Sequence, residues 1–250
     1  KRDGDRLGFP VFPLNWIDPN TGEQSSGYRE RGYIPQAFVN MLAFLGWNPG
    51  NEQEIFSMQE LIDAFSFEHI HKAGARFDPE KAKWFNEQYL RSTDAHLIAE
   101  QIKLDVQQAF QLEENDHRLT PTFLNTAVEI LKPRVQFAHE MLVQGSYLFQ
   151  APTAYDQAVI DKRWKESSAD FFHALCNQFA AVSDWTRERI ESTVQQTATD
   201  AGIKPGEIMQ LLRVLVSGQP GGVDLMGMLE LLGQQEIITR IQHAVTHIKK

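Results

Sequence analysis

Apolar residues recur at helical spacing along most of the chain after residue 33, which predicts a mostly helical fold. Pro35 fits the first position of a helix, and the apolar residues that follow it lie three or four apart until Gly46. No stretch alternates apolar and polar residues well enough to build a sheet. We therefore predict the all-α class.

Further helix starts are marked by a capping residue or a proline. Ser57 and Glu60 have the spacing of a capping box, in which each side chain accepts a hydrogen bond from the other residue's backbone N–H. Asp78-Pro79, Thr120-Pro121 and Lys204-Pro205 each place a proline where a helix can begin without losing a hydrogen bond. The connections between these predicted helices are short and polar, as in helix-on-helix packing.

The first 33 residues are rich in Gly, Pro, Asn and Asp, and the turn sequence at 18–22 predicts a loop or a short hairpin. The rest of the chain suggests helical blocks with soft boundaries. We predict three domains, at 1–95, 96–160 and 161–250.

The composition is that of a folded protein, with 42% hydrophobic and 23% charged residues. No apolar run is long enough to span a bilayer, and the start lacks the pattern of a secretory signal, so we expect a cytoplasmic protein that does not contact membranes. The single cysteine, Cys176, excludes an intramolecular disulfide and is expected to be a core thiol. Its neighbours at 171–179 are mostly apolar.

The formal net charge of −9 argues against a protein that coats nucleic acid by bulk electrostatics. Segments 1–95, 96–200 and 201–250 carry −4, −6 and +1. RNA can still bind such a chain if the basic groups converge on one face, because charges farther apart than about 8–10 Å are screened.

Three places combine side chains suited to RNA. In the helix that starts at Pro79, Lys81, Trp84, Asn86 and Arg91 offer cations, an amide and an indole for a ribose-phosphate backbone. The alternative is that Trp84 is a core anchor and the cations are solvated, which is common on amphipathic helices.

The second place is Lys132-Pro133-Arg134, where proline ends the preceding helix and projects Arg134 from the junction. A guanidinium there can bind the edge of an unstacked base. The alternative is a cation near a helix C-terminus, worth about 0.3–1 kcal/mol.

The third place is the glycine-rich turn after Ser217, flanked by Arg213 and by a helix over 225–232 that Asp224 can cap. Taken alone, this pattern is typical of an ordinary helical hairpin.

Other chemistry is weakly supported. His69 with His71, and His243 with His247, have spacings that a metal could use, but no third ligand lies nearby in sequence, so we expect no metal site. An independent hydrolase is disfavoured because no nucleophile and base can be paired. The alternative is a helical scaffold that binds proteins and no RNA, which would agree with the net negative charge of the chain.

An ordered set of motifs points to one family. The motifs are Tyr28-Arg29-Glu30, Gly32-Tyr33-Ile34-Pro35, Asn40, Leu45-Gly46-Trp47 and the segment 77–91, Phe-Asp-Pro-Glu-Lys-Ala-Lys-Trp-Phe-Asn-Glu-Gln-Tyr-Leu-Arg. In this order they resemble the region after the catalytic domain of bacterial glutamyl-tRNA synthetases. The resemblance covers nearly the whole chain. It implies a stem-contact domain followed by two helical anticodon-binding subdomains, with the nucleotide-binding catalytic domain absent.

The resemblance implies a role for each candidate. Lys1 and Arg2 match the end of the family's ATP-facing loop, and the four side chains of the 79–91 helix belong to the stem-contact fold that faces the inside of the tRNA. Arg134 falls where family members carry an arginine that checks the third anticodon base. Arg213, Gly222 and Leu225 belong to a loop that cradles anticodon bases.

The function implied by the resemblance is to hold the glutamate tRNA. The complete enzyme would use ATP and Mg²⁺ to attach glutamate to that tRNA, whereas the fragment is expected to be inactive and to need no cofactor. We expect a monomer that binds this tRNA and no DNA.

Overall fold

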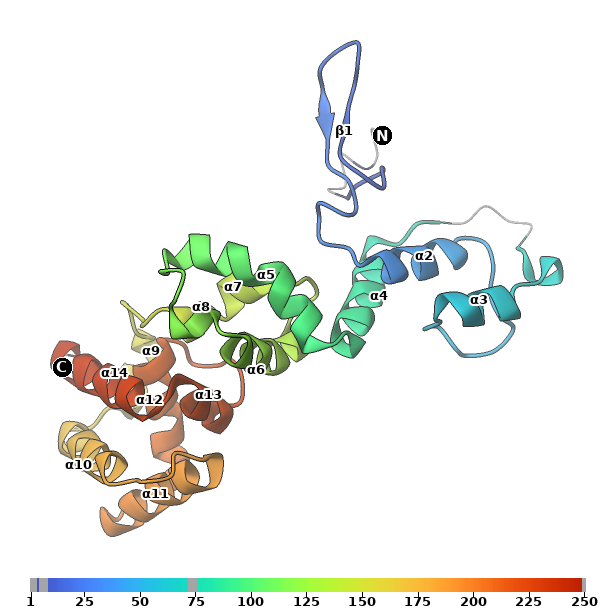
Figure 1. Ribbon diagram of the computed structural model, residues 1–250. Coiled ribbons are helices and arrows are strands. Elements are labelled where there is room, and N and C mark those ends of the chain that lie inside the picture. The colour runs from blue at the N-terminus through green and yellow to red at the C-terminus, as the bar shows by residue number, and fades with distance from the viewer. Residues whose placement is uncertain (1–3, 5–8, 72–75, 249–250) are drawn as a thin grey trace. The chain divides into compact units, whose positions relative to one another are not determined.

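The structure is a computed structural model that describes residue 4, residues 9–71 and residues 76–248 (Figure 1). Within that part of the chain there are thirteen α-helices, three short 3₁₀ helices and one two-stranded hairpin, so the all-α prediction is confirmed. The contacts divide the chain into two compact units. The first is Lys1–Asp94 with Lys132–Glu140, and the second is Ala95–Leu131 with Met141–Lys250.

The first unit begins with the antiparallel hairpin of β1 (Trp16–Ile17) and β2 (Gln24–Ser25), in which Trp16 lies opposite Ser25. Asp18 holds the turn, since its Oδ1 accepts hydrogen bonds from the backbone N–H of Asn20 at 2.8 Å and of Thr21 at 3.2 Å. This confirms the expected loop or short hairpin around 18–22.

The helices of the first unit surround an aromatic core. They are α2 (Pro35–Ala43), α3 (Met58–Ala64), η1 (Phe67–His69), α4 (Pro79–Ser92) and η3 (Lys132–Arg134). Helix α2 packs along α4, and the core between them includes Tyr33 and Phe85. Phe137 joins this core from a distant part of the sequence, with its ring edge-on to Tyr33 at 4.9 Å between centroids.

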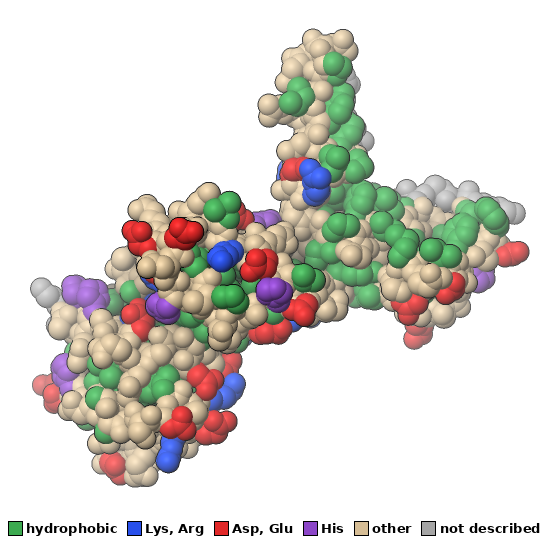
Figure 2. Space-filling model, viewed as in Figure 1, with side chains coloured by type: hydrophobic (Ala, Val, Ile, Leu, Met, Phe, Trp, Pro, Cys, Tyr) green, Lys and Arg blue, Asp and Glu red, His purple; other side chains and the backbone are tan. Residues whose placement is uncertain are grey.

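The outer face of α3 and η1 is apolar and exposed. Its side chains are Met58, Ile62, Phe65, Phe67 and Ile70, and Phe67 is 81% exposed. Figure 2 shows hydrophobic side chains gathered over this part of the first unit. These residues therefore add little to the core that holds the unit together.

Capping side chains and prolines in the first turn explain where several helices start. Ser57 Oγ accepts from Glu60 N at 3.2 Å, and Glu60 Oε2 accepts from Ser57 N at 2.7 Å, which confirms the capping box. Asp78 caps α4 by accepting from two backbone N–H groups, and Pro79 and Pro205 occupy first-turn positions as predicted. Thr120 caps the helix that begins at Pro121, since its Oγ1 accepts a longer bond of 3.4 Å from Phe123 N.

In the described residues of the second unit, helices are the only regular secondary structure. Its helices are α5 (Ala95–Phe110), η2 (His117–Leu119), α6 (Pro121–Leu131), most of α7 (Glu140–Gln144), α8 (Ser146–Phe149), α9 (Gln157–Arg163), α10 (Ser168–Ala180), α11 (Arg187–Asp200), α12 (Pro205–Ser217), α13 (Leu225–Leu232) and α14 (Gln234–His247). Helix α5 packs on α6, while α10 packs on both α11 and α14 (Figure 1).

The core of the second unit contains Phe172, Leu175 and Phe179 from α10, all inaccessible to solvent. Cys176 lies beside them at 4% exposure, and burial raises the pKa of its thiol to about 11. This confirms the prediction of a core thiol.

A largely buried ion pair between Asp116 and Arg118 makes the stability of the second unit depend on pH. Arg118 binds both carboxylate oxygens of Asp116, with Nε at 2.8 Å and Nη2 at 2.6 Å, and also donates to the carbonyl oxygen of Phe149. The hydrogen bonds from Arg118 hold the pKa of Asp116 at about 2, below its ordinary 3.8.

We therefore expect acid to weaken this unit through Asp116. Because the pKa in the folded state lies below the unfolded value, the pair adds about 2 kcal/mol above pH 5, and roughly half of this is lost by pH 3. Urea unfolding of the wild type and of Asp116→Asn at pH 6 and pH 3 measures this. The difference in the free energy of unfolding between these two proteins should be smaller at pH 3 than at pH 6. For Asp184→Asn, which changes an exposed carboxylate, the difference from the wild type should be the same at both pH values.

Candidate nucleic-acid interface

Lys81 lies on the first turns of α4 and is already paired. Its Nζ is 2.6 Å from Glu54 Oε1 and 4.0 Å from the centre of the Trp84 ring. Both charged side chains are about two-fifths exposed, so the pair borders solvent. A phosphate that approaches Lys81 would have to compete with Glu54, in a contact of modest strength.

Asn86 is fully buried, and its amide is used inside the first unit. Its Oδ1 accepts from Ile34 N at 2.7 Å, and its Nδ2 donates to Gln136 O at 2.6 Å. The side chain thus joins α4 to two segments about 50 residues away on either side. This placement differs from the exposed amide that the sequence suggested, because the polar group binds backbone rather than facing solvent.

Arg91, near the end of α4, is partly exposed and has two partners. Its Nη2 pairs with the carboxylate of Glu87 one turn earlier and donates to Pro133 O at 3.0 Å. Its guanidinium therefore lies beside the segment that carries Arg134.

Arg134 is the last residue of η3, directly after α6 ends at Leu131. Pro133 ends α6 as predicted, because it has no N–H to continue the helix. The Arg134 side chain is exposed and makes no hydrogen bond or ion pair with the residues that the structure describes. The next residue, Val135, is buried at 1% exposure. The backbone beside Arg134 is therefore fixed, while the Arg134 guanidinium itself is exposed.

The glycine-rich turn between α12 and α13 is held by two side chains of the second unit. Arg213 Nη1 donates to Val223 O at 2.8 Å, and Val223 N donates to the hydroxyl of Tyr147 at 3.2 Å. Gly222 has φ +140°, and a Cβ there would lie 2.8 Å from the Tyr147 hydroxyl oxygen. The turn thus needs glycine for both its backbone angle and its closeness to Tyr147.

Leu225 is the first residue of α13, and its side chain is buried at 8% exposure. Asp224 caps the helix as predicted, with Oδ2 accepting from Gly227 N at 2.7 Å. The Leu225 side chain is therefore almost inaccessible, so a ligand at this turn could contact little more than its backbone.

Sequence reasoning missed the buried arginine that supports this region. Arg240 on α14 is 3% exposed; its Nη1 donates to Tyr147 O at 2.6 Å and Val216 O at 3.1 Å, and its Nε binds Glu236 at 2.7 Å. Burial lowers the pKa of Arg240 from its ordinary value. In the sequence, Arg240 with Glu236 looks like an exposed pair one helical turn apart, so no local signal separates it from a surface cation.

The structure groups the candidates by unit. Lys81, Trp84, Asn86, Arg91 and Arg134 belong to the first unit, where α4 contacts η3. Arg213, Gly222 and Leu225 lie together around the turn in the second unit. Lys1 and Arg2 lie outside the described residues.

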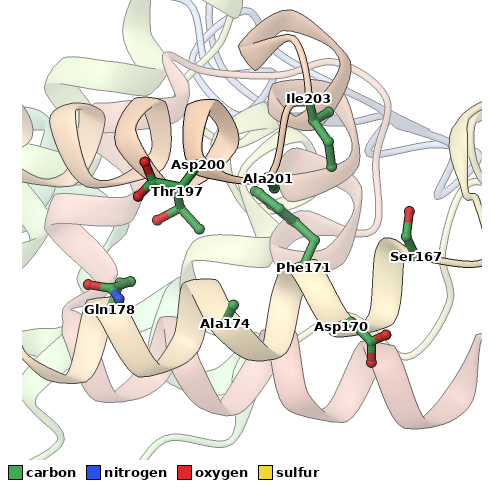
Figure 3. Close-up of a pocket in the computed structure, with 9 residues that line it drawn as sticks. All are labelled: Ser167, Asp170, Phe171, Ala174, Gln178, Thr197, Asp200, Ala201 and Ile203. Carbon is green, nitrogen blue, oxygen red and sulfur yellow. The ribbon is translucent and has the colours of Figure 1, made fainter.

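The pocket between α10 and α11 is a separate feature of the second unit. It has a volume of about 450 Å³, and its lining includes the apolar side chains of Phe171 and Ile203 and the carboxylates of Asp170 and Asp200 (Figure 3). Carboxylates repel phosphate, and no candidate RNA-binding residue lines this pocket.

The described residues contain neither a cluster of metal-ligating side chains nor a helix that could cross a membrane. No three histidine, cysteine or acidic side chains gather there as metal ligands, including at His69 with His71 and His243 with His247. In the same residues, none of the helices has the length and apolar character needed to cross a membrane.

Two family descriptions match the chain. Residues 80–245 match the family described as "Anticodon binding domain". Residues 19–84 match the family described as "tRNA synthetases class I (E and Q), catalytic domain".

Similar proteins carry the name glutamate–tRNA ligase. The protein from Christiangramia forsetii is 39% identical over 249 residues, which are 100% of this chain and 48% of the relative. The protein from Porphyromonas gingivalis is 42% identical over 245 residues, which are 98% of this chain and 47% of the relative. The chain thus spans about half the length of the curated relatives it matches.

Two solved structures are similar over the same extent. A glutamate tRNA ligase from Elizabethkingia meningosepticum, in complex with its amino acid, has a TM-score of 0.90 at 37% identity. The match covers 99% of this chain and 48% of the chain in that structure. Glutamate-tRNA synthetase from Elizabethkingia anophelis has a TM-score of 0.87 at 36% identity. This match covers 98% of this chain and 47% of the chain in that structure.

Proposed function

Because the chain belongs to the family of anticodon-binding domains, we propose that it holds the anticodon arm of the glutamate tRNA within a glutamate–tRNA ligase. The observation that carries the proposal is the exposed, unpaired Arg134 on an anchored backbone. An arginine in this setting can present its planar fork to one base edge with little loss of conformational freedom. Its proposed role is to check the third anticodon base.

The proposal assigns the other candidates by their accessibility. Lys81 and Trp84 contact the tRNA backbone from α4, and Arg213 with the backbone at Gly222 forms the second contact surface. Asn86 and Leu225, which are buried, support these surfaces from below. Residues 1–95 would serve as the stem-contact domain, and 96–160 and 161–250 as the two anticodon-binding subdomains.

The complete protein would perform the chemistry. We propose that it attaches glutamate to its tRNA in the cytoplasm as a monomer, with ATP and Mg²⁺ bound by parts outside this chain and with Lys1 and Arg2 near the nucleotide. The chain by itself is then a tRNA-binding module without catalytic activity.

Binding to labelled tRNA tests the proposal. Filter binding should compare the glutamate tRNA with a copy changed only at the third anticodon base, at about 50 and 200 mM salt. We expect the wild type to prefer the unchanged tRNA, and Arg134→Gln to lose about tenfold of that preference, as for loss of a side chain that contacts a base edge. Lys81→Gln should weaken both tRNAs alike and reduce the salt dependence.

The controls separate this from the rival function. Arg189→Gln, at an exposed cation on α11, should bind both tRNAs like the wild type. If the wild type binds neither tRNA, or Arg134→Gln weakens both equally, Arg134 does not check the anticodon. Absence of any tRNA binding would favour the helical scaffold.

A further inference from the structure

We infer that Arg91 and Asn86 are positioning residues for Arg134, which they serve by fixing the backbone on both sides of it. This inference rests on the proposed function, since it concerns how Arg134 selects a base. It replaces the direct RNA contacts that the sequence suggested for Arg91 and Asn86 with an indirect role.

The two side chains bind carbonyl groups that flank Arg134. Arg91 Nη2 donates to Pro133 O at 3.0 Å, one residue before Arg134, and Asn86 Nδ2 donates to Gln136 O at 2.6 Å, two residues after it. Both donors lie on α4, a single helix of 14 residues. One rigid element therefore fixes both ends of the short segment that carries the free cation.

The other groups of this segment are also fixed. Glu140 Oε2 accepts from the backbone N–H of Gln136 at 2.8 Å and of Phe137 at 3.2 Å. Val135 is 1% exposed, and Phe137 packs edge-on against Tyr33. Among the side chains at 134, 135 and 137, only that of Arg134 is exposed to solvent.

The charges around Arg91 favour support over phosphate binding. Its guanidinium already has an anionic partner, Glu87, and a carbonyl partner, Pro133 O. A phosphate would have to displace Glu87 or share the cation with it. Arg134 has no such partner among the described residues, so it is the cation available to a base.

The physical consequence is preorganisation. A guanidinium distinguishes bases only if the arginine backbone is held where its N–H groups can reach the edge of the base. Each extra degree of freedom of that backbone lowers the affinity for the correct base. Residues 132–140 belong to the same compact unit as α4 rather than to the unit that contains α6. Although Arg134 falls in the proposed subdomain 96–160, it is thus fixed to the unit that contains residues 1–94, which are proposed to contact the tRNA stem.

A double-mutant cycle tests the inference. Arg91→Met, Arg134→Gln and the double variant should be compared for binding to the glutamate tRNA and to the copy altered at its third anticodon base. We expect Arg91→Met to reduce the wild-type preference about three- to tenfold while leaving affinity for the altered tRNA nearly unchanged. In the Arg134→Gln background it should change the preference no further.

Two further variants sharpen the comparison. Arg91→Lys keeps one donor for Pro133 O and should restore part of the preference. Lys83→Met removes a comparable helix-surface ion pair, Lys83 with Glu80 at 2.8 Å, and should leave the preference intact. Equal weakening of both tRNAs by Arg91→Met would mean direct phosphate contact, and an additive loss in the double variant would mean independent action. Either result overturns the inference.

Hydrogen exchange separates this inference from the proposed function. Amides at 134–137 should exchange faster in Arg91→Met than in the wild type or Lys83→Met, without RNA present. If the wild type shows no anticodon preference, the proposed function fails, although faster exchange would still support backbone positioning. Unchanged exchange overturns the positioning role whatever the RNA result.

Discussion

Replacing Arg240 with methionine is expected to destabilise the second unit by about 3 kcal/mol. The change removes the donors to Tyr147 O and Val216 O and leaves two buried carbonyl groups without partners, at a cost of about 1–3 kcal/mol each. Methionine fills most of the same volume, so the cavity cost is small. Glu236 is 43% exposed and can be hydrated once its partner is gone.

Urea unfolding followed by circular dichroism measures this loss. Arg189→Met, which removes an exposed arginine from α11, should change the free energy of unfolding by less than about 0.5 kcal/mol. Arg240→Lys keeps a single ammonium group and should fall between the wild type and Arg240→Met. If Arg240→Met matches Arg189→Met, the two carbonyls must find other donors and Arg240 is not a structural anchor.

The helix starts could be predicted from the sequence because a cap is a local interaction. Ser57 and Glu60 are three residues apart, and Asp78 accepts from residues two and three positions later. Spacing alone then determines which donors and acceptors can meet. The same holds for the end of α6, where Pro133 acts on its own neighbours.

The tertiary hydrogen-bond partners of the candidate site residues could not be predicted in the same way. The partner of Asn86 at Gln136 is 50 residues away, and that of Arg91 at Pro133 is 42 away. The residue types suit RNA and backbone equally well, so only the tertiary fold decides which they bind. Arg134 was predicted more easily, because its exposure follows from the adjacent helix end.

The membership of 132–140 in the first unit was also hidden in the sequence. These residues follow α6 directly, and the predicted blocks placed them with the helices around them. The side chain of Phe137, however, fills the aromatic core beside Tyr33, more than 100 positions earlier. Helical periodicity describes one element at a time and carries no information about such a pair.

Replacing Asn86 with alanine is expected to destabilise the first unit by about 3 kcal/mol. The amide joins Ile34 N and Gln136 O, and its loss leaves a buried donor and a buried acceptor unpaired. Gln88→Ala, on the same helix and without a hydrogen bond to the described residues, is the matched control and should cost less than about 1 kcal/mol.

Asn86→Asp distinguishes the two bonds of this amide. The carboxylate can still accept from Ile34 N, but it faces Gln136 O with no donor and adds a buried charge, so this variant should be at least as destabilised as Asn86→Ala. Thermal or urea unfolding of the three variants measures the order. If Asn86→Asp proves as stable as the wild type, the bond to Gln136 O contributes nothing. The segment carrying Arg134 would then depend on Arg91, Glu140 and its buried side chains alone.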